Sequence, residues 1–216
     1  MHGGELVGLV VELVVLSATG ALSPGPLTFA LLAEGAKKGW RAGLYAALGH
    51  VAVEAPLILL LALGASALVS SREFQSAVSL VGGLVLAYYT ALSLKDLLRG
   101  STGSPARGAS HSSPFILGAL LTGLNPHFLL WWATIGVKIV VDILSCLGGG
   151  WPLVLAMYPL HAWLDLVWLP IVAFLGSRGR RLGQKPFKAL LAALTLLMAY
   201  FAASFTYSGL TALIPA

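Results

Sequence analysis

Long apolar stretches separated by short polar ones dominate the hydropathy pattern of this chain. A transmembrane helix needs about 20 consecutive, mainly apolar residues, and six stretches satisfy this requirement. The predicted spans are 6–33, 42–70, 77–94, 115–137, 152–176 and 189–214. The longest hydrophilic stretch, 99–113, is rich in Ser and Gly and is typical of a flexible loop. The pattern predicts an all-α integral membrane protein that forms a single membrane domain over residues 1–216.

Proline interrupts the first and the fourth predicted span. Proline removes a backbone donor and clashes with the carbonyl four residues earlier, so it breaks or kinks a helix. After such a break, a new half-helix begins with unpaired N–H groups and roughly half a positive charge at its N-terminus. The interrupting residues are Ser23, Pro24, Gly25 and Pro26 in the first span, and Asn125 and Pro126 in the fourth.

Each half of the chain also carries a histidine with a carboxylate four residues later, deep inside an apolar stretch. The pairs are His50 with Glu54 and His161 with Asp165. Four residues make about one helical turn, so each pair shares a helix face. With a rise of about 1.5 Å per residue, both carboxylates fall near the centre of a hydrocarbon core about 30 Å thick. Ionisable groups at this depth are functional-site hypotheses by default.

These features recur in the same order in the two halves. A Thr-Gly dipeptide precedes each proline break, a His–carboxylate pair follows in the next span, and an Ala-Tyr dipeptide lies in the third. Because each half has three spans, the second half enters the membrane from the opposite side. We therefore expect two inverted three-helix repeats, 6–98 and 114–214, joined by a cytoplasmic loop at 99–113, as in many secondary transporters.

Composition and charge agree with this class. A mean hydropathy of +0.90, with 58% hydrophobic and 10% charged residues, excludes a soluble globular protein. All but two of the 13 Lys and Arg residues lie in loops 1, 3 and 5; the two exceptions are Arg72 and Lys138. By the positive-inside rule, this alternation predicts that both termini lie outside the cell membrane. The basic surplus is therefore a topology signal and does not indicate a nucleic-acid partner.

The two half-helix N-termini and the two carboxylates suit a zwitterionic substrate. The substrate carboxylate would lie at the helix N-termini, and its ammonium group at Glu54 or Asp165. The same acids could instead carry protons, because a histidine beside a carboxylate can exchange protons near neutral pH. The sequence leaves both roles open. The tryptophans of the later spans are expected mostly in packing or in an interfacial belt.

Several motifs resemble the lysine-exporter (LysE/RhtB) family across essentially the whole chain. They are the Ser-Pro-Gly-Pro element at 23–26, the basic Gly-rich loop at 37–43, Gly49, the Leu-Asn-Pro element at 124–126, and His161-x-x-x-Asp165-x-x-Trp168. The resemblance implies a six-helix exporter of amino acids and similar small metabolites, driven by the proton gradient.

The resemblance also implies particular site residues. It favours the proline motifs as the substrate pocket and Glu54 at a position that is often acidic in the family. His127, directly after the Asn-Pro pair, and His50 depart from the family pattern, and the broader superfamily also includes cation exporters. We count His127 among the candidate pocket residues.

Two alternatives to an amino-acid exporter remain open. In a divalent metal-ion exporter, His50, Glu54, His161 and Asp165 would converge as nitrogen and oxygen ligands. In an intramembrane metalloenzyme, the same cluster would activate water, but the sequence has no HExxH motif to support it. The leading prediction is a transporter without catalytic residues or cofactor. Its expected partners are lipids, a small-molecule substrate and protons, with homo-oligomerisation open.

Overall fold

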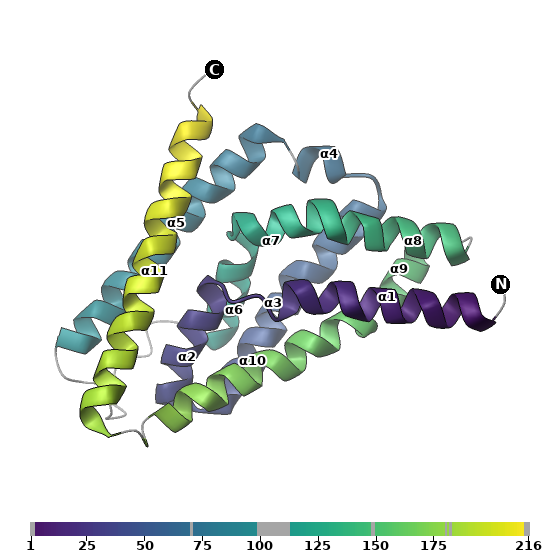
Figure 1. Ribbon diagram of the computed structural model, residues 1–216. Coiled ribbons are helices and arrows are strands. Elements are labelled where there is room, and N and C mark those ends of the chain that lie inside the picture. Colours follow the sequence, from purple (N-terminus) through teal and green to yellow (C-terminus); the bar gives the residue numbers. More distant parts are fainter. Residues whose placement is uncertain are drawn as a thin grey trace.

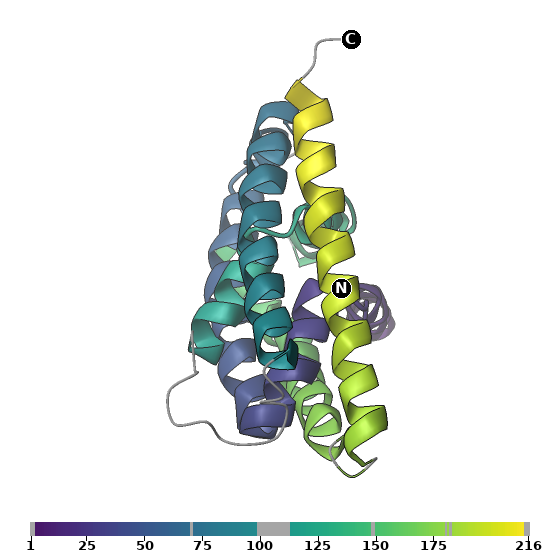
Figure 2. The same ribbon diagram turned by 90° about the vertical axis from the view of Figure 1, so that its left-hand side faces the viewer.

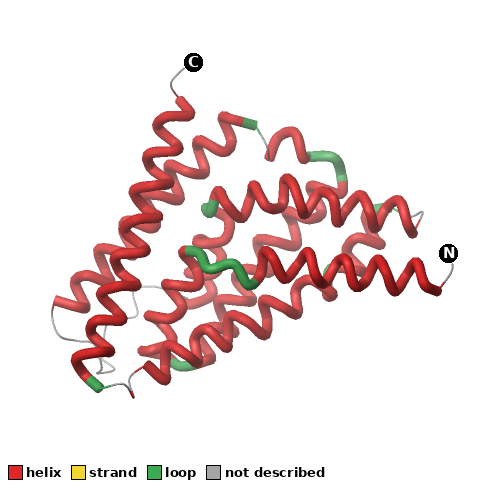
Figure 3. Tube along the Cα trace, in the orientation of Figure 1, coloured by secondary structure: helices red, strands yellow, loops and turns green. Residues whose placement is uncertain are grey.

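The structure of the chain, a computed structural model, describes residues 3–69, 71–98, 113–147, 150–179, 181 and 183–213. In this part of the chain the secondary structure is helical, with short loops and turns between the helices (Figure 3). Six segments are long and apolar enough to cross a membrane. The predicted all-α fold with six spans is therefore confirmed. The predicted loop 99–113 lies outside the described residues, apart from Ser113.

The first half of the chain contributes five helices (Figure 1). They are α1 (Gly3–Ala21), α2 (Pro26–Lys38), α3 (Trp40–Ala62), the short α4 (Ser66–Val69) and α5 (Arg72–Leu98). The second half contributes the remaining elements. They are α6 (Pro114–Gly123), α7 (Pro126–Trp131), the π-helical segment η1 (Trp132–Gly136), α8 (Val137–Leu147), α9 (Trp151–Met157), α10 (Pro159–Gly179) and α11 (Gln184–Leu213).

Both predicted helix breaks are present. In the first span, α1 ends at Ala21 and α2 begins with Pro26 at its first position, after the extended N-cap residue Gly25. In the fourth span, α6 ends at Gly123, and the side chain of Asn125 caps α7 by accepting a hydrogen bond from the backbone N–H of His127 at 3.0 Å. The helices α2 and α7 run away from these breaks in different directions (Figure 1).

The fourth span differs from its predicted extent of 115–137. The segment of spanning length is Pro126–Leu147, and α6 before it is a shorter apolar helix. The prediction stopped at the charged residue Lys138, which lies inside α8 in the structure. Its ammonium group contacts the carboxylates of Glu12 on α1 and Asp142 one turn later, so the charge is compensated and the helix continues.

Close helix contacts at glycine hold the centre of the fold together. A Cβ atom added to Gly35 of α2 would overlap the backbone of Ala173 on α10, and one added to Gly43 of α3 would overlap the backbone at Leu169. Small residues let helix backbones approach in this way inside membranes. The long helices α5 and α11 lie side by side in both views of the fold (Figures 1 and 2).

Among the described residues, two apolar clusters form the core, and buried polar residues of α3 lie between them. Along α3, Ala46 and Ala47 belong to the first cluster, while Leu57 and Ile58 belong to the second. His50 and Glu54 fall between these two sets on the same helix and are also buried. The fold therefore places its buried ionisable groups at the junction of the two clusters.

The close approach of α2 and α10 predicts a specific cost for added side-chain volume. We expect Gly35→Ala to destabilise the protein by about 1–3 kcal/mol, because the new methyl group must push against backbone atoms of α10. The matched control is Gly8→Ala in α1, where an added Cβ meets nothing within 4 Å. Thermal unfolding in detergent measures both. Equal melting temperatures for Gly35→Ala and the wild type would contradict this packing.

Candidate functional site

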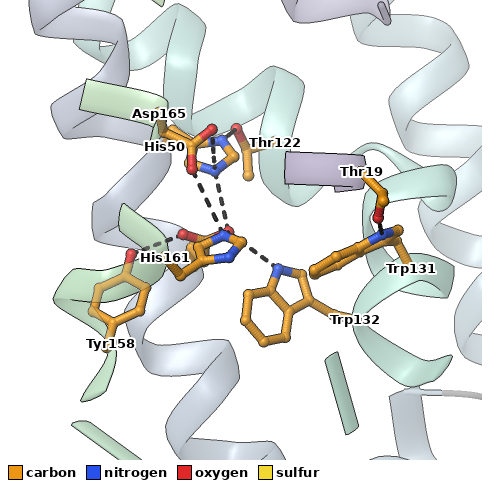
Figure 4. Close-up of polar contacts among 9 residues, drawn as sticks. Thr19, His50, Thr122, Trp131, Trp132, Tyr158, His161 and Asp165 are labelled. Atoms are coloured by element: carbon orange, nitrogen blue, oxygen red, sulfur yellow. Dashed lines mark hydrogen bonds and ion pairs between the residues drawn. The ribbon is translucent and has the colours of Figure 1, made fainter. Parts of the chain in front are cut away.

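The crossing of α3 and α10 brings the four predicted ionisable residues into one cluster. His50 Nε2 lies 3.2 Å from Glu54 Oε1 on its own helix and 3.7 Å from Asp165 Oδ1 on α10. His161 Nε2 lies 3.1 Å from Glu54 Oε1 across the helix pair and 3.6 Å from Asp165 Oδ2. Each histidine thus faces both carboxylates. Figure 4 shows the side chains of His50, His161 and Asp165 converging.

Glu54 is the centre of this cluster. Besides the two histidines, the indole N–H of Trp132 donates a hydrogen bond to its Oε1 at 3.1 Å. The hydroxyl of Tyr158 donates to Oε2 at 2.8 Å. The carboxylate is only 1% exposed, and burying such a group without partners would be costly. Four hydrogen-bonding partners therefore hold Glu54. His50 lies on the same helix, and the other three join α3 to η1, to the turn before α10 and to α10.

Asp165 is equally buried but has weaker contacts. It is 3% exposed, and the Nε2 atoms of His161 and His50 lie 3.6 and 3.7 Å from its oxygens. Within the described part of the chain, Asp165 Oδ2 and the second ring nitrogen of His161, Nδ1, have no hydrogen-bond partner. The equivalent nitrogen of His50 lies 2.8 Å from Thr122 Oγ1. The two His–carboxylate pairs, alike in sequence, therefore differ in their surroundings.

A cavity of about 210 Å³ connects this cluster with both helix breaks. Its lining includes all but one of the predicted site residues. Those that line it are Ser23, Pro24, Gly25, Pro26, His50, Glu54, Asn125, His127, His161 and Asp165. The exception is Pro126, which is buried at the first position of α7. Of the described residues that line the cavity, none is Lys or Arg.

The sequence did not indicate the donors to the histidine–carboxylate cluster. Trp132 was expected in packing or at the membrane interface, yet it is 2% exposed and bonded to Glu54. Thr122 appeared only as part of a repeated dipeptide, and Tyr158 gave no signal. Aromatic side chains also form part of the cavity wall, among them Phe128 and Trp131. The π-helical segment that begins at Trp132 is a feature often found at functional sites.

The same geometry bears on the metal alternative. One ligand atom each from His50, Glu54 and Asp165 lies within 4.8 Å of the others. Nitrogen and oxygen ligands of this kind suit zinc or a similar divalent cation. The cluster therefore has the chemistry for a cation as well as for protons or an ammonium group.

A helical membrane protein with a cavity that is lined by ionisable side chains and by two helix breaks has the architecture of a small-molecule transporter. The family model described as LysE type translocator matches residues 18–209, and the chain belongs to this family. It is therefore a multi-pass membrane exporter of small molecules. Comparisons with curated proteins and with solved structures gave no match.

The hydrogen bond from Tyr158 to Glu54 predicts a measurable loss of stability. Tyr158→Phe removes only the hydroxyl group and leaves a buried oxygen of Glu54 without its donor, so we expect destabilisation by about 1–3 kcal/mol. Tyr200→Phe is the matched control, because Tyr200 is 65% exposed. Thermal unfolding in detergent compares the two variants. The same small effect in both would show that the Tyr158 hydrogen bond contributes nothing to stability.

Proposed function

We propose that this protein is a proton-coupled secondary exporter of amino acids or similar small metabolites in the plasma membrane, working by alternating access around the cavity. The observation that supports this proposal most is that one cavity is lined by both helix breaks and by the histidine–carboxylate cluster. Elements that bind an anion and elements that bind a cation or protons thus face the same space.

The anionic end of the substrate would lie at the helix breaks. Gly25 and Asn125 are the N-cap residues of α2 and α7, and both line the cavity. Backbone N–H groups at helix N-termini favour a carboxylate. Since none of the described lining residues is Lys or Arg, these helix ends are the groups we assign to carboxylate binding. His127, in the first turn of α7, lies beside them.

Proton coupling would use the histidine–carboxylate cluster. Imidazole and carboxyl groups buried at membrane depth are typical of proton relays. In the proposed cycle, the two inverted repeats, 6–98 and 114–214, expose the cavity first to one side of the membrane and then to the other. The distribution of basic residues supports an orientation with both termini outside.

A divalent metal ion is the second candidate substrate. It is favoured by the three ligand atoms of His50, Glu54 and Asp165 that lie within 4.8 Å of one another. Against it, three donors besides His50 already bond to Glu54, so this carboxylate would have to exchange partners to coordinate a metal. We therefore favour the amino-acid exporter.

Coupling predicts that the buried acids are required for transport but not for membrane insertion. In proteoliposomes with an imposed pH gradient, we expect Glu54→Gln and Asp165→Asn each to abolish gradient-driven export of amino acids. Both variants should still insert, because each replaces a carboxyl group with an amide of the same size. The control is Asp142→Asn, which removes a carboxylate whose Oδ2 lies 2.6 Å from Lys138 Nζ.

Two results would contradict the proposal. Wild-type export rates in Glu54→Gln and Asp165→Asn would exclude these acids from the mechanism. Stoichiometric metal in the purified wild-type protein that is lost in either variant would favour the metal-ion exporter instead.

The cavity also predicts that an added side chain at the first break blocks binding. Gly25 has an extended backbone with φ −145°, and a Cβ there would meet nothing within 4 Å. Gly25→Leu should therefore fold normally, fill part of the cavity and weaken amino-acid binding at least about tenfold, the effect of about 1.4 kcal/mol. Binding is measured by calorimetry in detergent. Gly8→Leu is the control, and unchanged affinity in Gly25→Leu would place the substrate elsewhere.

A further inference from the structure

The two buried carboxylates of the cavity differ in how completely they are hydrogen-bonded. Both oxygens of Glu54 have hydrogen-bond partners: the two histidines and Trp132 at Oε1, and Tyr158 at Oε2. Asp165 faces the same histidines at the longer distances of 3.6 and 3.7 Å. Its Oδ2 has no hydrogen-bond partner among the described residues. An acceptor of this kind, in a residue 3% exposed, is costly to leave unsatisfied.

A second unsatisfied atom lies one helical turn away. His161, four residues before Asp165 on α10, has no described hydrogen-bond partner at Nδ1 and is 5% exposed. Both residues line the cavity. Two buried polar atoms on one helix face, both in residues that line the cavity, therefore lack hydrogen-bond partners among the described residues. Glu54 lines the same cavity, but both of its carboxylate oxygens already have hydrogen-bond partners.

We propose that Asp165 is the residue that binds the ammonium group of the substrate, and that Glu54 is a positioning residue that holds the two histidines. This proposal rests on the proposed function and assigns the cationic end of the substrate to one of the two candidate acids. An ammonium group has three N–H donors, and one of them would satisfy the unpartnered Oδ2 of Asp165. At Glu54, the same ammonium group would have to displace Trp132, Tyr158 or a histidine.

The assignment explains the unequal surroundings of two pairs that are alike in sequence. Glu54 sits where η1 and the turn before α10 supply Trp132 and Tyr158. Glu54 Oε1 in turn lies 3.2 Å from His50 Nε2 and 3.1 Å from His161 Nε2. Asp165 Oδ2 is left without a hydrogen-bond partner among the described residues, and the nearby imidazole groups limit how strongly Asp165 holds a cation. A carboxylate in this setting can bind an ammonium group and release it again.

The test compares an amino acid with the same molecule lacking its amino group. The standard L-amino acids are first screened by thermal shift on wild-type protein that is kept metal-free by a chelator in the buffer. Calorimetry then gives the affinities of the best-binding amino acid and of its des-amino carboxylic acid. The variants are Asp165→Asn, Glu54→Gln and, as matched control, Asp142→Asn. Asp165→Glu is added because it keeps the charge but moves it by one methylene group.

We expect the wild type and Asp142→Asn to prefer the amino acid by about 10- to 100-fold, the value of a hydrogen bond to a charged group. Asp165→Asn should lose this preference by weakening the amino acid alone, and Asp165→Glu should reduce it. Glu54→Gln should weaken both ligands by similar factors, so the preference remains. This ratio separates an ammonium-binding residue from a positioning one.

Four results would overturn the assignment. A preference retained in Asp165→Asn, or one lost in Glu54→Gln, would remove Asp165 from ammonium binding while leaving the amino-acid exporter intact. A wild type that binds the amino acid and the des-amino acid equally would do the same. If the standard L-amino acids all fail to bind the wild type, the proposed substrate class fails and the assignment fails with it.

Discussion

The hydrogen bonds around Glu54 are the constraint on which the rest of the site depends. A carboxylate that is 1% exposed inside a membrane protein must find its partners within the protein. Glu54 finds them on η1, on α10 and in the turn before α10, as well as one turn earlier on its own helix. These contacts fix the position along α3 at which it crosses α10. They also fix the position of the histidines relative to the cavity.

Glycine packing makes this crossing close enough for the polar contacts. Gly43 of α3 lies against the backbone of α10 at Leu169, and Gly118 of α6 lies against the backbone of α3 at Ala46. Both contacts fall about one turn or more from His50, on the side of the first apolar cluster. Larger side chains there would separate the helices, and the 3.1 Å contact between His161 and Glu54 would be lost. The apolar and the polar contacts therefore depend on one another.

Local chemistry predicted the parts of the site that depend on single segments. Proline in an apolar run breaks a helix wherever it lies, so the breaks before Pro26 and Pro126 followed from sequence. The His–carboxylate spacing of four residues likewise placed each pair on one helix face. The sequence could not predict which other side chains form hydrogen bonds with each His–carboxylate pair. Trp132 and Tyr158 reach Glu54 only because α7 to α10 fold back beside α3, and a lone indole or phenol in an apolar helix gives no sign of this.

The repeated Thr-Gly dipeptides are a second case in which the sequence does not predict the hydrogen-bond partners. Thr122 lies beside His50, as a symmetric pairing would have it, but Thr19 instead accepts a hydrogen bond from the indole N–H of Trp131 at 3.2 Å. His161 is thereby left without the partner that Thr122 gives His50. Similar sequences thus produce unequal sites, because Trp131 and Trp132 follow Pro126 at the positions where Leu31 and Leu32 follow Pro26.

This inequality matters for a transporter, because its binding site must be incomplete in order to accept a ligand. A cavity with both carboxylates fully bonded would have no acceptor for a cation, and one with both unsatisfied would be unstable inside the membrane. A site with one fully hydrogen-bonded carboxylate and one carboxylate that lacks a partner meets both requirements. In the proposed assignment, Glu54 would hold the helices and imidazoles in place, and Asp165 would bind the molecule that is carried. If the substrate is the zwitterion proposed above, helix N-termini with only about half a charge each would hold its carboxylate less tightly than a Lys or Arg side chain would.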